Sequence, residues 1–105
     1  MANNGNELIE ITIKKHDGDS TRCSPDKSFV AIPGDKIVFH FDEEKQASIT
    51  FQGDSPFSNL NKPVKIDEEM TVAAQAKKKP YKYQITWTQN GGGTGNGGGV
   101  VQSSR

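Results

Sequence analysis

The feature that most constrains the fold of this chain is a strict two-residue alternation of apolar and polar side chains. It is clearest near the C-terminal end, where Tyr81, Tyr83, Ile85 and Trp87 alternate with Lys, Gln and Thr. Because successive side chains of a β-strand point to opposite faces, this period predicts a strand with one apolar face. Helical spacing of apolar residues is nearly absent, so the pattern predicts an all-β fold.

Weaker forms of the same pattern occur in residues 9–14, 29–32, 36–41, 47–51, 64–66 and 70–74. Turn residues separate these segments, as at Asp17-Gly18-Asp19 and Pro33-Gly34-Asp35, where Pro presets φ and Gly allows a positive φ. We expect a hairpin-like return after the second turn. Seven or eight short strands with such turns predict an antiparallel β-sandwich with Greek-key connections.

The predicted domain covers residues 8–90 and follows a flexible N-terminal segment at 1–7. Seven glycines occupy residues 91–99, and such a stretch is typical of a flexible loop or tail. Residues 91–105 are therefore predicted to be a glycine-rich loop or tail. Val100 and Val101 leave open a short closing strand at 99–102, in which case the glycines form an internal loop.

The charge balance narrows the classes of partner. Thirteen basic and thirteen acidic residues among 105 give a net charge of zero, so no overall field attracts nucleic acid or an anionic membrane. The longest basic run, Lys77-Lys78-Lys79, precedes Pro80 and is interpreted as a solvated turn or as protection of a sheet edge. We expect neither nucleic acid nor a membrane as partner.

Cys23 is the only cysteine, which excludes an internal disulfide and favours a reducing compartment. The polar first residues lack the features of a secretory signal, and no apolar run reaches membrane-spanning length. These patterns predict a soluble, cytoplasmic protein, while an exported protein trimmed of its signal would have the same sequence.

Residues 24–39, SPDKSFVAIPGDKIVF, run through a strand-like segment, a Pro-Gly-Asp turn and an alternating segment. This succession resembles one found in the cupredoxin family. Residues 47–51 are similar to its next strand, and residues 80–85, PYKYQI, are similar to its Tyr-x-Tyr-x-Cys run. The resemblance covers residues 24–87 and implies a cupredoxin-like Greek-key sandwich.

The positions that bind copper in that family carry no donor atoms in this sequence. Ala47 stands where the family has a His, and Ile85 stands where it has the Cys thiolate. Residues 86–99 contain no His or Met to supply the remaining ligands. Because a blue-copper site needs two imidazoles and one thiolate, the resemblance implies the fold without electron transfer or a cofactor. We expect the former metal end to be packed core.

His16, Cys23 and His40 are the only strong metal donors apart from carboxylates. An atypical copper or redox site built from them stays open as an alternative, although a metal site normally needs three or four well-spaced ligands. His40 lies on the polar side of its strand, so we expect it to face solvent. The cation of Arg22 would lower the pKa of Cys23 only weakly. An inert thiol is the favoured interpretation, and we expect no enzyme activity.

Phe57 and Trp87 are the two candidate partner-binding residues. Phe57 lies in the polar loop from Gly53 to Lys62, where it either plugs the end of the sandwich or anchors a partner. For Trp87, core packing beside Ile85 is the favoured interpretation, but its place at the strand end makes it the aromatic residue most expected to be exposed. Aromatic residues are enriched at interfaces, which supports the second possibility for both.

These observations favour a non-catalytic, metal-free binding or assembly module that contacts another protein, or a second copy, through end loops or an edge strand. Two alternatives from other classes remain. One is the atypical copper or redox protein, and the other is a small-ligand or carbohydrate binder that uses Trp87.

Overall fold

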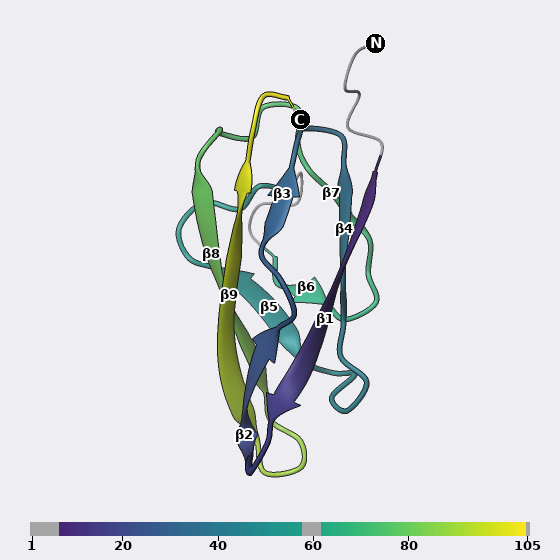
Figure 1. The fold of residues 1–105 in the computed structure, drawn as a ribbon, viewed down its shortest axis with the longest axis vertical. Coiled ribbons are helices and arrows are strands. Elements are labelled where there is room, and N and C mark those ends of the chain that lie inside the picture. Colours follow the sequence, from purple (N-terminus) through teal and green to yellow (C-terminus); the bar gives the residue numbers. More distant parts are fainter. Residues whose placement is uncertain (1–6, 58–61, 105) are drawn as a thin grey trace.

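The computed structural model describes residues 7–57 and 62–104, which form nine β-strands and no helix (Figure 1). The all-β prediction is therefore confirmed. No helix in this part of the chain has the length and apolar character needed to cross a bilayer. The strands are β1 (Leu8–His16), β2 (Asp19–Pro25), β3 (Phe29–Ala31), β4 (Lys36–His40), β5 (Ser48–Phe51), β6 (Val64–Lys65), β7 (Met70–Thr71), β8 (Pro80–Trp87) and β9 (Gly93–Val101).

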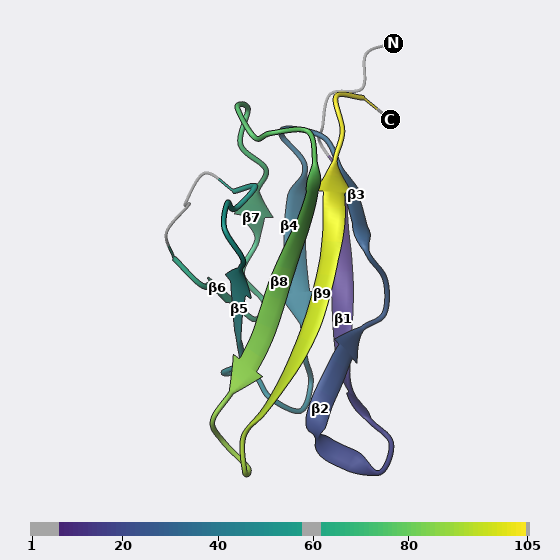
Figure 2. The same ribbon diagram turned by 90° about the vertical axis from the view of Figure 1, so that its left-hand side faces the viewer.

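The strands form one mixed sheet in the order β6-β5-β8-β9-β2-β1-β4-β7, with β3 also paired to β9. The sheet rolls up around a central core and is nearly barrel-shaped (Figures 1 and 2). β1 runs parallel to β4, and both β2 and β3 run parallel to β9. The prediction of a purely antiparallel arrangement is therefore wrong. Alternation indicates which face of a strand is buried, but it carries no information about the direction of the neighbouring strand.

The turn at residues 33–35 forms as predicted, but it does not make a hairpin. Gly34 has a φ of 95°, in the region that only Gly enters easily. The buried carboxylate of Asp35 accepts hydrogen bonds from the backbone N–H of Ile32 at 3.0 Å and of Glu7 at 3.1 Å. The chain passes from β3, which pairs with β9, to β4, which pairs with β1 and β7. The turn thus carries the chain across the core.

β8 follows the alternation of its sequence without a break. Its residues are alternately exposed and buried from Pro80 to Trp87, and the buried set is the predicted one. Tyr83 packs edge-on against Phe39 of β4, with ring centroids 5.1 Å apart. This contact crosses the core, because β8 and β4 belong to opposite walls of the barrel. The aromatic face of β8 therefore supplies much of the bulk of the core.

The glycine tract is a strand, which corrects the prediction of a mobile loop or tail. β9 pairs with β8 over eight residue pairs, from Pro80 opposite Val100 to Trp87 opposite Gly93. On its other side it pairs with β2 and β3. β9 begins just after the predicted domain boundary at residue 90, and Val100 and Val101 are its last two residues. Residues 1–6 of the predicted N-terminal segment lie outside the described residues.

The glycines of β9 have a packing role. Gly93, Gly95, Gly97 and Gly99 occupy alternate positions, and a Cβ at any of them would collide with a neighbouring side chain. The space beside each glycine is filled by a side chain from another strand. In order along β9, these side chains are Trp87, Cys23, Tyr83 and Phe29. Folding an aromatic ring over a strand glycine is a known means of stabilising such positions. Tertiary packing therefore outweighs the low strand propensity of Gly.

Candidate functional site

Phe57 is part of the core. Its side chain is fully buried, and its backbone forms an isolated bridge with Val72. The ring packs edge-on against Phe51, with centroids 5.3 Å apart. The ring of Phe57 is therefore packed in the core and not exposed to solvent.

Trp87 is also buried, with 4% of its surface exposed. Its ring stands perpendicular to Phe41 at a centroid distance of 5.4 Å. The prediction of core packing is confirmed, and the expectation that Trp87 is exposed at the strand end is wrong. The loop after β4 and the β8–β9 turn extend past this strand end, which alternation alone does not show. The Trp87 ring is therefore packed in the core rather than exposed to solvent.

The three candidate metal donors do not come together. His16 Nε2 lies 2.7 Å from Ser24 Oγ, and Cys23 points into the core from β2. Burial raises the pKa of the Cys23 thiol to about 11, opposite to the small decrease expected from Arg22. His40 lies on β4 and is held by other residues. Within residues 7–57 and 62–104, no group of three His, Cys, Asp or Glu side chains is arranged to hold a metal ion.

His40 is clamped between two carboxylates rather than free in solvent. Its Nδ1 lies 2.7 Å from Asp67 Oδ1, and its Nε2 lies 3.0 Å from Glu10 Oε1. Carboxylates only accept hydrogen bonds, so both contacts are hydrogen bonds when both ring nitrogens of His40 carry a proton. The hydrogen bond to Asp67 is the main reason that the pKa of His40 is raised. These residues are far apart in the sequence, so alternation gave no signal for the cluster.

The two positions where copper ligands stand in the resembled family lie in the core. Ala47 is 2% exposed and Ile85 is fully buried. Ile85 lies directly opposite Ile49 in the antiparallel pair of β5 and β8. Both side chains are therefore core residues.

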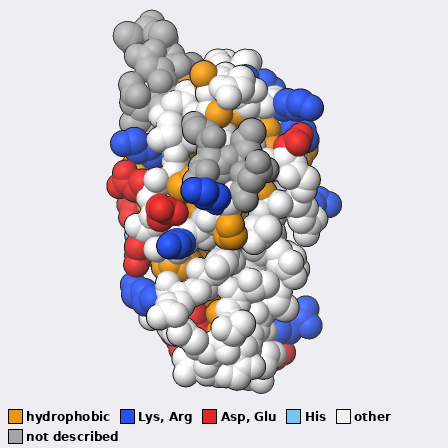
Figure 3. All heavy atoms as spheres, turned by 180° about the vertical axis from the view of Figure 1, so that it is seen from behind, with side chains coloured by type: hydrophobic (Ala, Val, Ile, Leu, Met, Phe, Trp, Pro, Cys, Tyr) orange, Lys and Arg blue, Asp and Glu red, His pale blue; other side chains and the backbone are white. Residues whose placement is uncertain are grey.

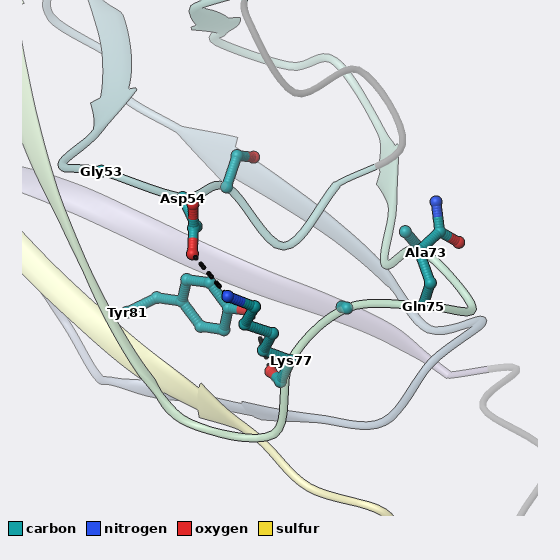
Figure 4. Close-up of a pocket in the computed structure, with 8 residues that line it drawn as sticks. Gly53, Asp54, Ala73, Gln75, Lys77 and Tyr81 are labelled. Carbon is teal, nitrogen blue, oxygen red and sulfur yellow. Dashed lines mark hydrogen bonds and ion pairs between the residues drawn. The ribbon is translucent and has the colours of Figure 1, made fainter.

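A pocket of about 240 Å³ lies between the loop that follows β5 and the loop that leads into β8 (Figure 4). Tyr81 lies at its base, and Figure 4 shows Asp54 and Lys77 pointing toward each other above the ring. Its lining combines small apolar groups with polar rim residues: Gly53, Asp54, Ser55, Ala73, Gln75, Ala76, Lys77 and Tyr81. The sequence analysis selected Phe57 as the candidate residue of the loop after β5. The pocket is instead lined by Gly53, Asp54 and Ser55 of that loop.

Charges at the rim of this pocket are organised around Asp54. Its Oδ2 lies 2.9 Å from Lys79 Nζ and 3.7 Å from Lys77 Nζ, and the hydrogen bond from Lys79 lowers the pKa of Asp54. The Lys79 ammonium also lies 5.3 Å from the centre of the Tyr81 ring, a cation–π arrangement. Tyr81 donates a hydrogen bond from its hydroxyl to the Lys77 carbonyl at 2.8 Å. The basic run is thus a turn held by specific contacts.

Outside the pocket, acidic and basic side chains also lie close to one another. Figure 3 shows acidic and basic side chains interleaved along one side of the face opposite to that in Figure 1. The ion pairs of Lys45 with Asp67 at 3.2 Å and of Lys36 with Glu69 at 3.9 Å are examples. This distribution agrees with the zero net charge of the sequence.

The comparisons add no relative to this description. No protein-family model, no curated protein and no solved structure matches the chain.

Proposed function

We propose that this chain is a non-catalytic, metal-free, cupredoxin-like binding module that contacts another protein through the pocket above Tyr81. The observation that carries the proposal is the pocket itself, which combines an apolar base with a polar rim. Sites of this composition are typical of places where an apolar group is buried while polar contacts fix its orientation.

The cupredoxin-like part of the proposal is supported by the positions of the resembling segments. The Pro33-Gly34-Asp35 turn joins two strands, and the segments that contain Ala47 and Ile85 lie side by side through the pairing of β5 and β8. Burial of both side chains explains how such a fold persists without a metal, since their apolar groups fill the space.

The size of the pocket supports a protein side chain as its occupant. A volume of about 240 Å³ is below the roughly 300–1,000 Å³ of sites for drug-sized ligands. The one carboxylate of the lining, Asp54, is contacted by two lysines: Lys77, which also lines the pocket, and Lys79, which lies beside it. The excess positive charge favours a partner segment with an apolar side chain next to an acidic one.

A photo-crosslinking experiment tests this function. A photoreactive amino acid replaces Gln75, an exposed residue of the rim, and the crosslinked products formed in a lysate of the source cells are identified by mass spectrometry. We expect a specific product that Lys77→Glu weakens at least several-fold, because charge reversal repels an acidic partner. Lys82→Glu, an exposed lysine of β8 outside this pocket, should leave it unchanged.

Two outcomes would contradict the proposal. One is that no specific product forms at Gln75, and the other is that the Lys77 and Lys82 variants weaken it equally. Light scattering on the purified chain identifies the case in which the partner is a second copy.

A further inference from the structure

The end of the barrel opposite the start of β1 and the end of β9 is closed by three segments that meet there (Figures 1 and 2). They are the end of β1, the loop from β4 to β5 and the turn from β8 to β9. The loop and the turn are tied by a hydrogen bond from Gln89 Nε2 to Gln46 Oε1 at 2.6 Å. Each of the three segments contributes one polar side chain to a cluster at this end: Lys15, Glu44 and Asn90.

Lys15 is an inward-facing lysine. It continues the buried side of β1 after Ile11 and Ile13, and its side chain is only 14% exposed. Its ammonium lies 5.7 Å from the centre of the Trp87 ring. Lysines are seldom placed this way, because a buried ammonium loses its hydration.

Glu44 lies between the other two members of the cluster, and its side chain is fully buried. Its Oε2 accepts a hydrogen bond from Asn90 Nδ2 at 2.8 Å and lies 3.6 Å from Lys15 Nζ. Its Oε1 has no hydrogen-bond partner among the residues that the structure describes. An ion pair of this kind, without its full set of hydrogen bonds, is expensive to bury.

We propose that Lys15 and Asn90 join in an intramolecular amide bond, with Glu44 as the proton carrier. A bond forms between Lys15 Nζ and Asn90 Cγ, and the bond between Asn90 Cγ and Nδ2 breaks. The Lys15 ammonium first gives one proton to Glu44, and the resulting neutral amine attacks. The second proton that this nitrogen loses is relayed through the Glu44 carboxyl group to the departing nitrogen, which leaves as ammonia, so Glu44 ends in its protonated form. The reaction needs no oxidant and no further reactant.

The geometry at Glu44 Oε2 favours this reaction over a simple ion pair. That one oxygen contacts both the nitrogen that must attack and the nitrogen that must leave. The Trp87 ring covers the amine on one side and restricts access of water. The product replaces a buried ion pair by a neutral amide, and it connects β1 to the β8–β9 turn. Such a link restricts the unfolded chain as a disulfide would, in a protein whose single cysteine forms none.

Intact-mass spectrometry of the purified, folded full chain tests the bond. We expect a mass about 17 Da below that calculated from the sequence, because one ammonia is lost. A tryptic digest should contain a branched peptide that joins Lys15 to Asn90. Lys15→Arg keeps the cation but removes the amine nucleophile, so it should have the full mass, as should Glu44→Gln. Lys14→Arg changes the exposed neighbouring lysine and should retain the loss.

Three results would overturn the proposal. A folded wild-type chain at its full mass means that no amide forms. A mass gain of about 1 Da means that Asn90 has deamidated next to Gly91 instead. A loss of 17 Da that persists in Lys15→Arg means that Asn90 has cyclised onto its own backbone, because that reaction does not involve Lys15.

Discussion

Gly97 and Tyr83 show how single atoms control the packing of β9. Gly97 lies directly opposite Tyr83, and a Cβ on Gly97 would collide with the phenol ring and hydroxyl. The hydroxyl is buried and has no hydrogen-bond partner among the described residues. Burial also raises the pKa of Tyr83, so the group stays neutral. The core therefore contains both a tight contact and an unsatisfied polar atom at the same place.

Gly97→Ala should lower the free energy of unfolding by about 1–3 kcal/mol, because the added methyl group overpacks the core. Urea unfolding followed by far-UV circular dichroism measures the effect. Asn96→Ala, an exposed position on the same strand, is the matched control and should change stability by less than about 0.5 kcal/mol. Equal losses of stability in the two variants would show that the contact between Gly97 and Tyr83 does not restrict the side chain at position 97.

Tyr83→Phe should leave stability unchanged or raise it by up to about 1 kcal/mol, because it removes a buried hydroxyl without a partner. It should also reduce the cost of Gly97→Ala, since the Cβ would meet the hydroxyl first. A double-mutant cycle of the two substitutions measures this coupling. A clear loss of stability in Tyr83→Phe would mean that the hydroxyl has a partner, such as a buried water.

At the scale of the strands, a charged cluster around His40, here called the clamp, connects β4 to its neighbours. His40 on β4 joins Glu10 on β1 to Asp67 in the loop between β6 and β7, and Lys45 also contacts Asp67. Asp67 has a φ of 65°, an uncommon conformation for a residue other than Gly. The clamp thus holds a strained loop against two strands.

The stabilising effect of this clamp should depend on pH. The pKa of His40 is raised in the folded state, so its contribution is complete below the unfolded value of about 6.5. The contribution is lost as the pH rises through the folded pKa. The free energy of unfolding, measured from about pH 5 to 9, should therefore fall over this interval, and His40→Gln should remove that fall.

His16→Gln is the matched control for this effect, because His16 contacts a neutral serine. The pH dependence should persist in that variant. Asp67 acts in the opposite direction, since its pKa is lowered by the hydrogen bond from His40. Its contribution is lost as the pH falls through that lowered pKa. A wild-type protein whose stability does not change as the pH rises would contradict the clamp.

β9 determines whether the remaining strands close into a barrel. Removal of residues 91–105 should abolish cooperative folding, because β8, β2 and β3 would all lose their shared neighbour. Removal of residues 103–105 alone is the control and should be tolerated, since the last described backbone bond of this end runs from Gln102 N to Ala31 O. Dispersion of amide signals in NMR spectra distinguishes a folded chain from an unfolded one. A folded 1–90 fragment would contradict the assigned role of β9.

For the molecule as a whole, the rate at which the Cys23 thiol reacts with a labelling reagent measures how often the barrel unfolds. Burial raises its pKa from 9.0 to about 11, which lowers the reactive thiolate fraction about a hundredfold near neutral pH. The thiol also lies against Gly95 of β9, inside the barrel. Labelling by a thiol reagent should therefore be slow in buffer and fast in denaturing urea. Fast labelling of the folded protein would show that β2 opens locally.

The sequence by itself predicted most of the strands, the buried side of the clearest of them, β8, and the turns at residues 17–19 and 33–35, but it did not predict β2. Alternation suffices for this, because a strand places successive side chains on opposite faces whatever surrounds it. It also determined that Ala47 and Ile85 are apolar, and hence their place in the core. The failed predictions concern features that depend on neighbours distant in the chain.

Only the tertiary structure decided the role of the glycine tract, the direction of neighbouring strands and the surroundings of Glu44. A tract that is flexible in isolation becomes a strand because Trp87, Cys23, Tyr83 and Phe29 use the space left by its missing side chains. Likewise, a glutamate in a charged loop becomes buried because Lys15 and Asn90 meet it from other segments. Pairings of this kind have no local signature, since they arise from the closure of the barrel.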